Sequence, residues 1–191
     1  MKLRLTIHVP NWLDRIFAWP VLLYRRKRYG HPFRRIHLTD GKFAIVDQQD
    51  FYWLNSFDWC LKENHGFLYA ARFNNFCDNP PKILSMHREI MNAPPGILVD
   101  HRNCYGLDNR RENIRFATHA QNNCNRRKRK NASSKYTGVI FDKQTGKWRA
   151  RITANGKMLS LGRSISEIDA AKAYDAAAKK YYGEFARVNF P

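Results

Sequence analysis

Residues 99–122 read VDHRNCYGLDNRRENIRFATHAQN. They place an acid, an imidazole and several carboxamides in one short segment. Such polar and ionisable side chains are costly to hold close together unless a charged group lies among them. We therefore expect a divalent metal ion and a phosphate group to be the partners of this segment.

Local patterns in this segment predict a strand, a loop, a second strand and a helix. Residues 97–99 form a β-type run that delivers Asp100 and His101 at its end, and residues 103–113, rich in Asn, Asp and Gly, are typical of a loop. Residues 114–117 predict another short strand. Thr118 and Gln121 have the spacing of a capping box, so a helix should begin at Thr118 and carry Asn122 in its first turns.

These side chains suit the hydrolysis of a phosphodiester, which needs a nucleophilic water, a cation and a stabilised leaving oxygen. A carboxylate and a carboxamide, here Asp100 and Asn122, are hard oxygen ligands for Mg²⁺ or Mn²⁺. An imidazole such as His101 is a natural general base. Spacing alone leaves another interpretation open, in which Asp100 and the asparagines form turns and His101 is a surface histidine.

Composition predicts two small modules and a polyanionic partner. The chain has 191 residues, 43% of them hydrophobic, and a net charge of +18 from 34 Lys and Arg against 16 Asp and Glu. Nucleic acid is the first candidate partner and an anionic membrane the second. The apolar residues 12–24 are interrupted by Asp14, Arg15 and Pro20, so we expect neither a membrane span nor a signal peptide. The cysteines show no CxxC pair, which favours reduced thiols.

The first part of the chain has a less specific pattern. Residues 1–35 fit either an amphipathic helix or a basic arm, and both interpretations stay open. Residues 36–46 predict a β-hairpin that turns at Asp40-Gly41, and residues 68–73 predict a strand. Residues 86–93 predict a short helix that ends before Pro94-Pro95-Gly96. The aromatic residues within 50–59 favour core packing over stacking on bases.

Short motifs on both sides of the loop resemble a known family. They are Met86-His87-Arg88, Val99-Asp100-His101, Leu107-Asp108-Asn109, Glu112-Asn113-Ile114-Arg115 and Gln121-Asn122. The set resembles the HNH homing endonucleases of phage and bacteria, in the variant whose last His is replaced by Asn. The resemblance covers residues 36–125, and its specific core lies within residues 86–125.

The resemblance implies a ββα-metal fold, of the α+β class, that hydrolyses DNA with one divalent cation, Mg²⁺ or Mn²⁺. Asp100 and Asn122 match the metal ligands and His101 the general base, whereas Asn113 matches the Asn that braces the loop and orients His101. His119 stands three residues before the third position of the motif, and we leave it out of the metal site. A zinc site is a further alternative that the resemblance disfavours; its ligands would be His101, Cys104, His119 and Cys124.

A basic linker over residues 126–135 follows. Its cationic residues are Arg126, Arg127, Lys128, Arg129 and Lys130. They fit contacts along a phosphate backbone. The alternative interpretation is a solvated linker or a basic run that resembles a nuclear-import signal.

The last module, residues 136–191, predicts three strands and one helix. The strands cover residues 137–141, 147–153 and 157–161, with turns at Thr145-Gly146 and Asn155-Gly156. In the second strand, Trp148, Ala150 and Ile152 should face one side, and Arg149, Arg151 and Thr153 the other. The Ala-rich residues 166–181 predict a helix that packs closely on the sheet.

This module resembles the AP2/ERF DNA-binding domain. The matching motifs are Tyr136-Thr137-Gly138-Val139, Gly146-Lys147-Trp148, Leu161-Gly162, Ala170-Ala171-Lys172-Ala173-Tyr174-Asp175, Tyr182-Gly183 and Val188-Asn189-Phe190-Pro191. The resemblance implies a three-stranded antiparallel sheet in the DNA major groove, packed on one helix. The residues expected to face DNA are Ile140, Lys147, Arg149, Arg151, Thr153 and Ser160. Ile140 and Ser160 replace the Arg and the Trp of the plant pattern, so the plant recognition sequence is not expected here.

Two functions of different classes follow. The first is a site-specific, metal-dependent DNA endonuclease of the homing type, in which the AP2-like module selects the site. It would act as a monomer on double-stranded DNA, in the cytoplasm of a bacterium or phage host. We expect no membrane association and no small-molecule cofactor. The second is a non-cleaving, DNA-binding transcriptional regulator with a decayed nuclease fold. The intact set of Asp100, His101, Asn113 and Asn122 favours the first.

Overall fold

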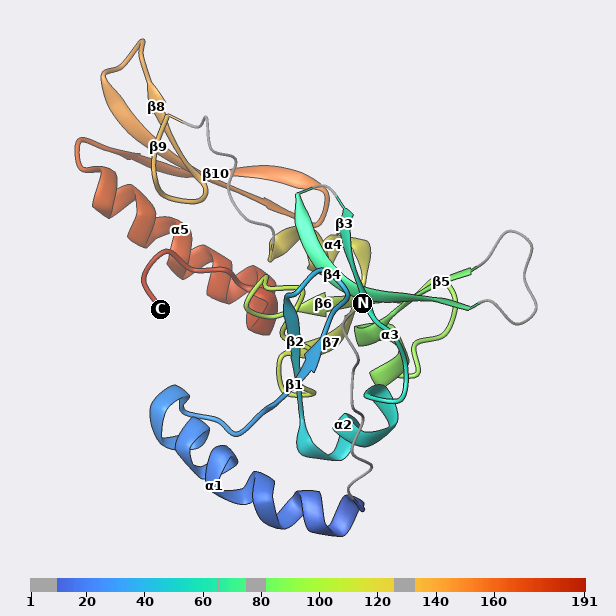
Figure 1. Cartoon of the computed structure of the whole chain (residues 1–191). Coiled ribbons are helices and arrows are strands. Elements are labelled where there is room, and N and C mark those ends of the chain that lie inside the picture. Colours follow the sequence, from blue (N-terminus) through green and yellow to red (C-terminus); the bar gives the residue numbers. More distant parts are fainter. Residues whose placement is uncertain (1–9, 65, 75–81, 126–132) are drawn as a thin grey trace. The chain divides into compact units, whose positions relative to one another are not determined.

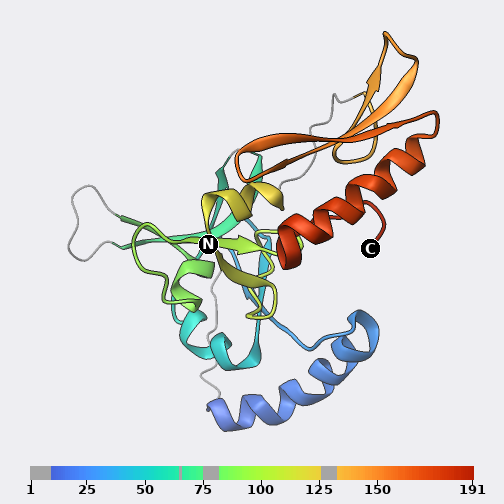
Figure 2. The same ribbon diagram turned by 180° about the vertical axis from the view of Figure 1, so that it is seen from behind.

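Short helices and small antiparallel sheets make up the computed structural model, which describes residues 10–64, 66–74, 82–125 and 133–191 (Figure 1 and Figure 2). The chain divides into two units. Unit 1 contains Met1–Pro95 and Tyr105–Arg115, and unit 2 contains Gly96–Cys104 and Phe116–Pro191. Within the described ranges, no helix has the length and apolar character needed to cross a bilayer.

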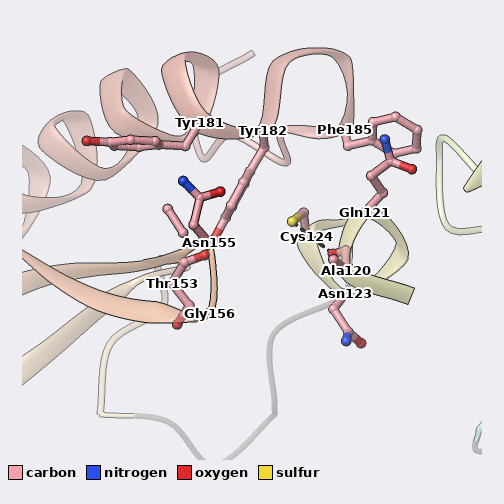
Figure 3. A pocket seen from close by; sticks show the side chains of 11 residues that line it. Ala120, Gln121, Asn123, Cys124, Thr153, Asn155, Gly156, Tyr181, Tyr182 and Phe185 are labelled. Carbon is pink, nitrogen blue, oxygen red and sulfur yellow. Dashed lines mark hydrogen bonds between the residues drawn. The ribbon is translucent and has the colours of Figure 1, made fainter. Parts of the chain in front are cut away.

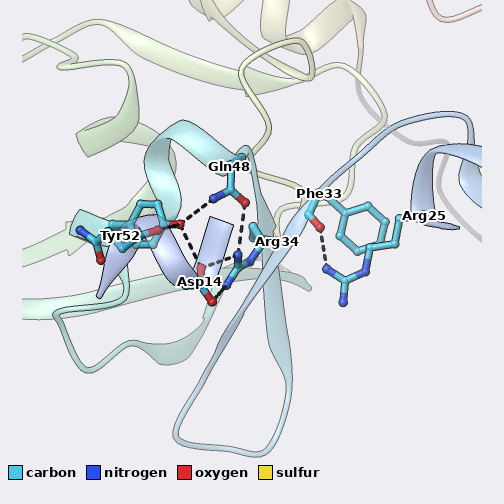
Figure 4. Close-up of polar contacts among 7 residues, drawn as sticks. Asp14, Arg25, Phe33, Arg34, Gln48 and Tyr52 are labelled. Atoms are coloured by element: carbon cyan, nitrogen blue, oxygen red, sulfur yellow. Dashed lines mark hydrogen bonds and ion pairs between the residues drawn. The ribbon is translucent and has the colours of Figure 1, made fainter. Parts of the chain in front are cut away.

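Unit 1 begins with the long helix α1 (Asn11–Tyr29), which makes up most of the described part of residues 1–35. Gly30 ends the helix in a left-handed conformation, with φ 81°. Asp14 anchors the helix, because its carboxylate accepts hydrogen bonds from Arg34 at 2.8 Å and from Tyr52 at 2.9 Å (Figure 4). The aromatic residues of α1 are exposed, including Trp12, Phe17 and Trp19.

The predicted hairpin is confirmed by β1 (Arg34–His37) and β2 (Phe43–Val46), which pair antiparallel. The turn between them uses Gly41 at φ 76°. A helix that the sequence did not predict, α2 (Gln48–Leu54), follows this hairpin. The indole of Trp59 is buried and donates to the Leu54 carbonyl at 2.7 Å, which confirms core packing for this aromatic, whereas Trp53 and Phe57 are exposed.

A second sheet in unit 1 joins three antiparallel strands: β3 (Cys60–Asn64), β4 (Phe67–Asn74) and β5 (Lys82–Ser85). The strand predicted at residues 68–73 is β4, and the predicted helix is the shorter α3 (Met86–Ile90). The segment Tyr105–Arg115 packs closely in this unit. A Cβ on Gly106 would overlap the Leu68 carbonyl and the Tyr69 ring, so this position requires glycine.

Unit 2 begins with the pattern predicted for the nuclease-like segment. β6 (Leu98–His101) and β7 (Ile114–Ala117) form a two-stranded sheet, and α4 (His119–Cys124) follows. The boundary with unit 1 falls inside β7, after Arg115. The predicted capping box is confirmed, because the Gln121 N–H donates to the Thr118 hydroxyl and the Thr118 N–H donates to the Gln121 side chain.

The rest of unit 2 is the predicted three-stranded sheet with one helix. Its strands are β8 (Val139–Asp142), β9 (Lys147–Ala154) and β10 (Lys157–Ser164), in the order β10-β9-β8. Helix α5 (Glu167–Tyr182) lies along one face of this sheet (Figure 2), and the turn η1 (Gly183–Phe185) follows. Val139 and Ala150 of the sheet and Ala170 and Ala171 of the helix form one core cluster, which confirms the close approach that small residues allow.

Candidate functional site

Asp100 and His101 lie together at the end of β6, as predicted, and both are buried, with 6% and 5% of their surface exposed. A buried carboxylate needs hydrogen-bond donors or a cation to remain ionised. The Asn125 side-chain amide supplies such a donor, at 3.1 Å from each carboxylate oxygen of Asp100. The same amide donates to the His101 carbonyl at 2.8 Å. One side chain therefore holds both candidate residues from the end of α4.

Asn122 occupies a different environment from Asn125. It is exposed on α4, and its backbone N–H makes the ordinary helical bond to the Thr118 carbonyl. Asn125, one turn later, is buried with 5% of its surface exposed. Sequence reasoning selected Asn122 and missed Asn125. The spacing of three residues, which places both on neighbouring parts of one helical face, is the signal that could have identified Asn125.

Cys104 completes this local network. Its backbone N–H donates to the His101 carbonyl at 2.9 Å, and its thiol donates to the Asn125 carbonyl at 3.0 Å. The residue has φ 57°, a left-handed conformation that is uncommon for a side chain other than glycine. The backbone bond closes the turn after β6, and the thiol bond ties this turn to the end of α4.

Asn113 belongs to unit 1, where it is buried and donates to the Asp108 carbonyl at 2.7 Å. Its loop is further held by a buried ion pair between Arg110 and Asp108 at 2.8 Å. Arg111 also bonds Asp50 at 2.7 Å. Asn113 therefore braces its loop, and the orientation of His101 by Asn113 stays a prediction.

The residue types proposed as ligands, Asp100 and Asn122, suit a hard cation better than zinc. A carboxylate with carboxamides on the next helix offers the oxygen ligands that Mg²⁺ and Mn²⁺ prefer. Among the described residues, no three His, Cys, Asp or Glu side chains lie close enough together to hold a metal ion. The four zinc candidates are thus not gathered into a zinc site, and His119 is exposed on α4.

A cavity of about 780 Å³ lies elsewhere in unit 2, beside α4 and the end of α5 (Figure 3). Its lining includes Cys124, Thr153, Asn155 and Tyr182, and no Lys, Arg, Asp, Glu or His. Burial raises the pKa of the Cys124 thiol, so the thiol stays protonated at neutral pH. With no charged lining residue and neither Asp100 nor His101 in its wall, this cavity does not suit a phosphodiester.

The exposed face of the β8–β10 sheet carries the predicted DNA-facing residues. Cross-strand pairing aligns Ile140 with Arg149, and Arg151 with Ser160. Ala150 and Ile152 are buried on the opposite face, which confirms the predicted alternation in β9. The other two predicted residues, Lys147 and Thr153, are exposed in the same strand.

Two arginines distinguish this face. The Arg149 Nε atom is buried and, among the described residues, has no hydrogen-bond partner. Arg163 lies opposite Arg149 because the register shifts between Ser160 and Arg163, and it pairs with Asp142 at 3.2 Å. The sequence did not identify Arg163, because a regular strand would place it on the other face. The basic residues Arg126, Arg127, Lys128, Arg129 and Lys130 lie outside the described residues.

Comparison with known proteins identifies a matching family in the last part of the chain. The AP2 domain family matches residues 134–184. The plant "AP2-like ethylene-responsive transcription factor TOE2" of Arabidopsis thaliana is 43% identical over 65 residues, which are 34% of this chain and 13% of that protein. The "APETALA2-like protein 2" of Oryza sativa subsp. indica is also 43% identical over 65 residues, 15% of its length. The chain thus spans a small part of these plant relatives.

A viral relative matches much more of the chain. The "Uncharacterized HNH endonuclease L560" of Acanthamoeba polyphaga mimivirus is 33% identical over 155 residues. These residues make up 78% of this chain and 75% of the viral protein.

Proposed function

The chain belongs to the family of the mimivirus protein described as HNH endonuclease L560, and we propose that it is a metal-dependent, site-specific DNA endonuclease. The observation that carries the proposal is the buried pair of Asp100 and His101 at the end of β6, held by Asn125 from the end of α4. An ionisable pair of this kind is costly to bury in a module that only binds DNA.

Each residue has a role that its chemistry suits. Asp100 and Asn122 would hold Mg²⁺ or Mn²⁺, which would offset negative charge on the scissile phosphate. His101 would accept a proton from the attacking water. Asn125 keeps the Asp100 carboxylate and the His101 backbone in place. Nicking of one strand at a time, by one site in a monomer, is the simplest form of this reaction.

The AP2 domain supplies DNA binding, since this domain implies a double-stranded DNA partner. We propose that the sheet face with Arg149, Arg151 and Thr153 enters the major groove, where guanidinium groups can pair bidentately with guanine or phosphate. The side chains of Arg149 and Arg151 are partly exposed on this face, opposite the buried Ala150 and Ile152, which supports this role.

A second function has its own support. The plant relatives of the AP2 domain are named transcription factors, so a non-cleaving DNA-binding regulator is the alternative. It would use the same sheet face but would not need the Asp100 and His101 pair.

The test is nicking of supercoiled plasmid DNA with Mg²⁺ or Mn²⁺ by wild type, His101→Ala and His119→Ala. We expect His101→Ala to lower the nicking rate by about 100-fold or more, because a general base contributes roughly 10²–10⁴. His119 is exposed at the start of α4 and serves as the matched control. We expect His119→Ala to keep wild-type activity.

The outcomes separate the two functions. Equal nicking by wild type and His101→Ala would remove the role given to His101. No nicking by any of the three proteins, with DNA binding retained, would favour the regulator. Circular dichroism of each variant checks that the buried His101 position tolerates alanine.

A further inference from the structure

A continuous set of hydrogen bonds joins the AP2 domain to the Asp100 and His101 pair, and all of its members belong to unit 2. The Arg187 guanidinium donates to the Cys104 sulfur at 3.1 Å. Cys104 in turn donates to the Asn125 carbonyl, and the Asn125 amide donates to the Asp100 carboxylate and the His101 carbonyl. Arg187 is thus three hydrogen bonds from the candidate catalytic residues.

Arg187 is held in place by the AP2 domain itself. Asn189, two residues later, is bound by the buried Asp175 of α5, which accepts from the Asn189 backbone N–H at 2.8 Å and from its side-chain amide at 2.9 Å. The Asn189 side chain also accepts from the Thr137 N–H at 2.7 Å, just before β8. The backbone around Arg187 therefore moves with the strand that carries Ile140.

Other interactions support the same connection. Glu184 of η1 pairs with Arg102, the residue after His101, at 2.9 Å. The neighbouring Phe185 is buried with 7% of its surface exposed and lines the cavity beside Gln121 of α4 (Figure 3). The exposed Glu184–Arg102 pair contributes little free energy alone, but it approaches β6 from the same short segment as Arg187.

We propose that Arg187, assisted by Glu184, is a positioning residue that fixes the distance between the DNA bound by the AP2 sheet and the phosphodiester cut at His101. This inference rests on the proposed endonuclease function. A fixed connection would select one phosphodiester at a set distance from the recognised sequence. Without these interactions, the reactive groups would reach several neighbouring phosphodiesters with poorer alignment.

The test variant is Glu184→Ala with Arg187→Ala, which removes one acid and one base and keeps the net charge at +18. Neither residue lies on the predicted DNA-binding face or in the Asp100 and His101 pair. The matched control is Asp169→Ala with Lys172→Ala, which makes the same exchange of charges at exposed positions of α5.

The first measurement needs no DNA. Hydrogen exchange of the α4 amides, residues 119–125, should be about tenfold faster in the test variant than in the wild type or the control, because the interactions that protect this helix end are removed. Unchanged exchange would overturn the inference, whatever the nuclease activity.

The second measurement uses a labelled duplex that wild-type protein selects from a random pool. Wild type and control should cut it at one position. The test variant should bind it with a Kd within about twofold, because charge is unchanged, but cut at several adjacent positions or lose about tenfold in rate at the main one, since small misplacements cost much rate. Arg187→Lys, with Glu184 restored, should recover part of the wild-type pattern.

The outcomes are distinguishable. Faster exchange with an unchanged cut position and rate would overturn the positioning role. If wild type binds the duplex but cuts it with neither Mg²⁺ nor Mn²⁺, the endonuclease proposal fails and the positioning role falls with it, while the exchange measurement still decides whether the Arg187 and Glu184 interactions hold α4.

Discussion

Asn125 is the residue on which the candidate site depends most. Its side-chain amide donates to both oxygens of Asp100 and to the His101 carbonyl, and its own carbonyl accepts from Cys104. Few side chains can bridge a strand end and a helix end with so many polar interactions. Asn125 therefore stabilises the geometry of the site, whereas the exposed Asn122 remains available to a ligand.

Replacing each asparagine by leucine should separate these roles. Asn125→Leu removes two hydrogen bonds from the buried Asp100 carboxyl group, so we expect a loss of about 2–3 kcal/mol in the free energy of unfolding. Asn122→Leu, the matched control at an exposed position, should change stability by less than about 0.5 kcal/mol but should lower metal-dependent nicking. Urea unfolding and plasmid nicking measure the two effects. Equal destabilisation by both changes would contradict the assignment.

Among the secondary-structure elements, the meeting of β8 and α5 depends on Gly138. Its φ is 75°, and a Cβ at this position would overlap the Tyr174 ring. Its carbonyl also accepts from the Arg151 N–H at 2.9 Å, which joins the start of β8 to β9. The strand and the helix can approach closely only because this residue has no side chain.

Gly138→Ala should therefore destabilise the AP2 domain by about 2–4 kcal/mol, because overpacking adds to the cost of a left-handed conformation. Gly146→Ala is the control, since Gly146 has φ 65° and a Cβ added there would have no atom within 4 Å, and its cost should be about 1 kcal/mol. Thermal unfolding followed by tryptophan fluorescence distinguishes the two. Similar costs at both positions would show that the Tyr174 ring can move aside.

For the protein as a whole, charge governs DNA affinity. A net charge of +18 favours binding to any DNA, so specific interactions must be separated from this general attraction. The sheet face and the exposed side of α5 both carry cations, yet only the sheet face combines them with an unpartnered buried donor among the described residues. Salt dependence can separate the two surfaces.

The double variant Arg149→Ala with Arg151→Ala should weaken DNA binding. The slope of the logarithm of the association constant against the logarithm of salt concentration should become shallower by about 2, because each phosphate that is no longer neutralised accounts for roughly 0.9 of the slope. Lys172→Ala with Lys179→Ala removes the same charge from exposed positions of α5 and should alter the slope less. Fluorescence anisotropy over a salt series provides both slopes. An equal change in the two variants would contradict the assignment of the DNA-binding face.

Local chemistry made much of this fold predictable. The capping box of Thr118 and Gln121, the hairpin turn at Gly41 and the alternation around Arg149 all depend on neighbouring residues, and the structure confirms each one. These features are set by hydrogen bonds and side-chain directions within a few residues, which a single sequence reveals.

Other features depend on three-dimensional geometry that spacing does not determine. The sequence pattern points to Asn122, and only the structure shows that Asn125 is buried against Asp100 whereas Asn122 is exposed. Arg163 reaches the same sheet face as Arg149 through a register shift in β10. Helix α2 was not predicted because its short aromatic run has no clear helical period.

The assignment of Tyr105–Arg115 to unit 1 has a consequence for how such a gene can exchange parts. Its flanking residues Gly96–Cys104 belong to unit 2, while its Arg111 is bonded to Asp47 and Asp50, far upstream. A recombination breakpoint between residues 96 and 115 would therefore separate partners in both units at once. Inheritance of the region from Asp47 to Asn125 as one block should be favoured over exchange within it.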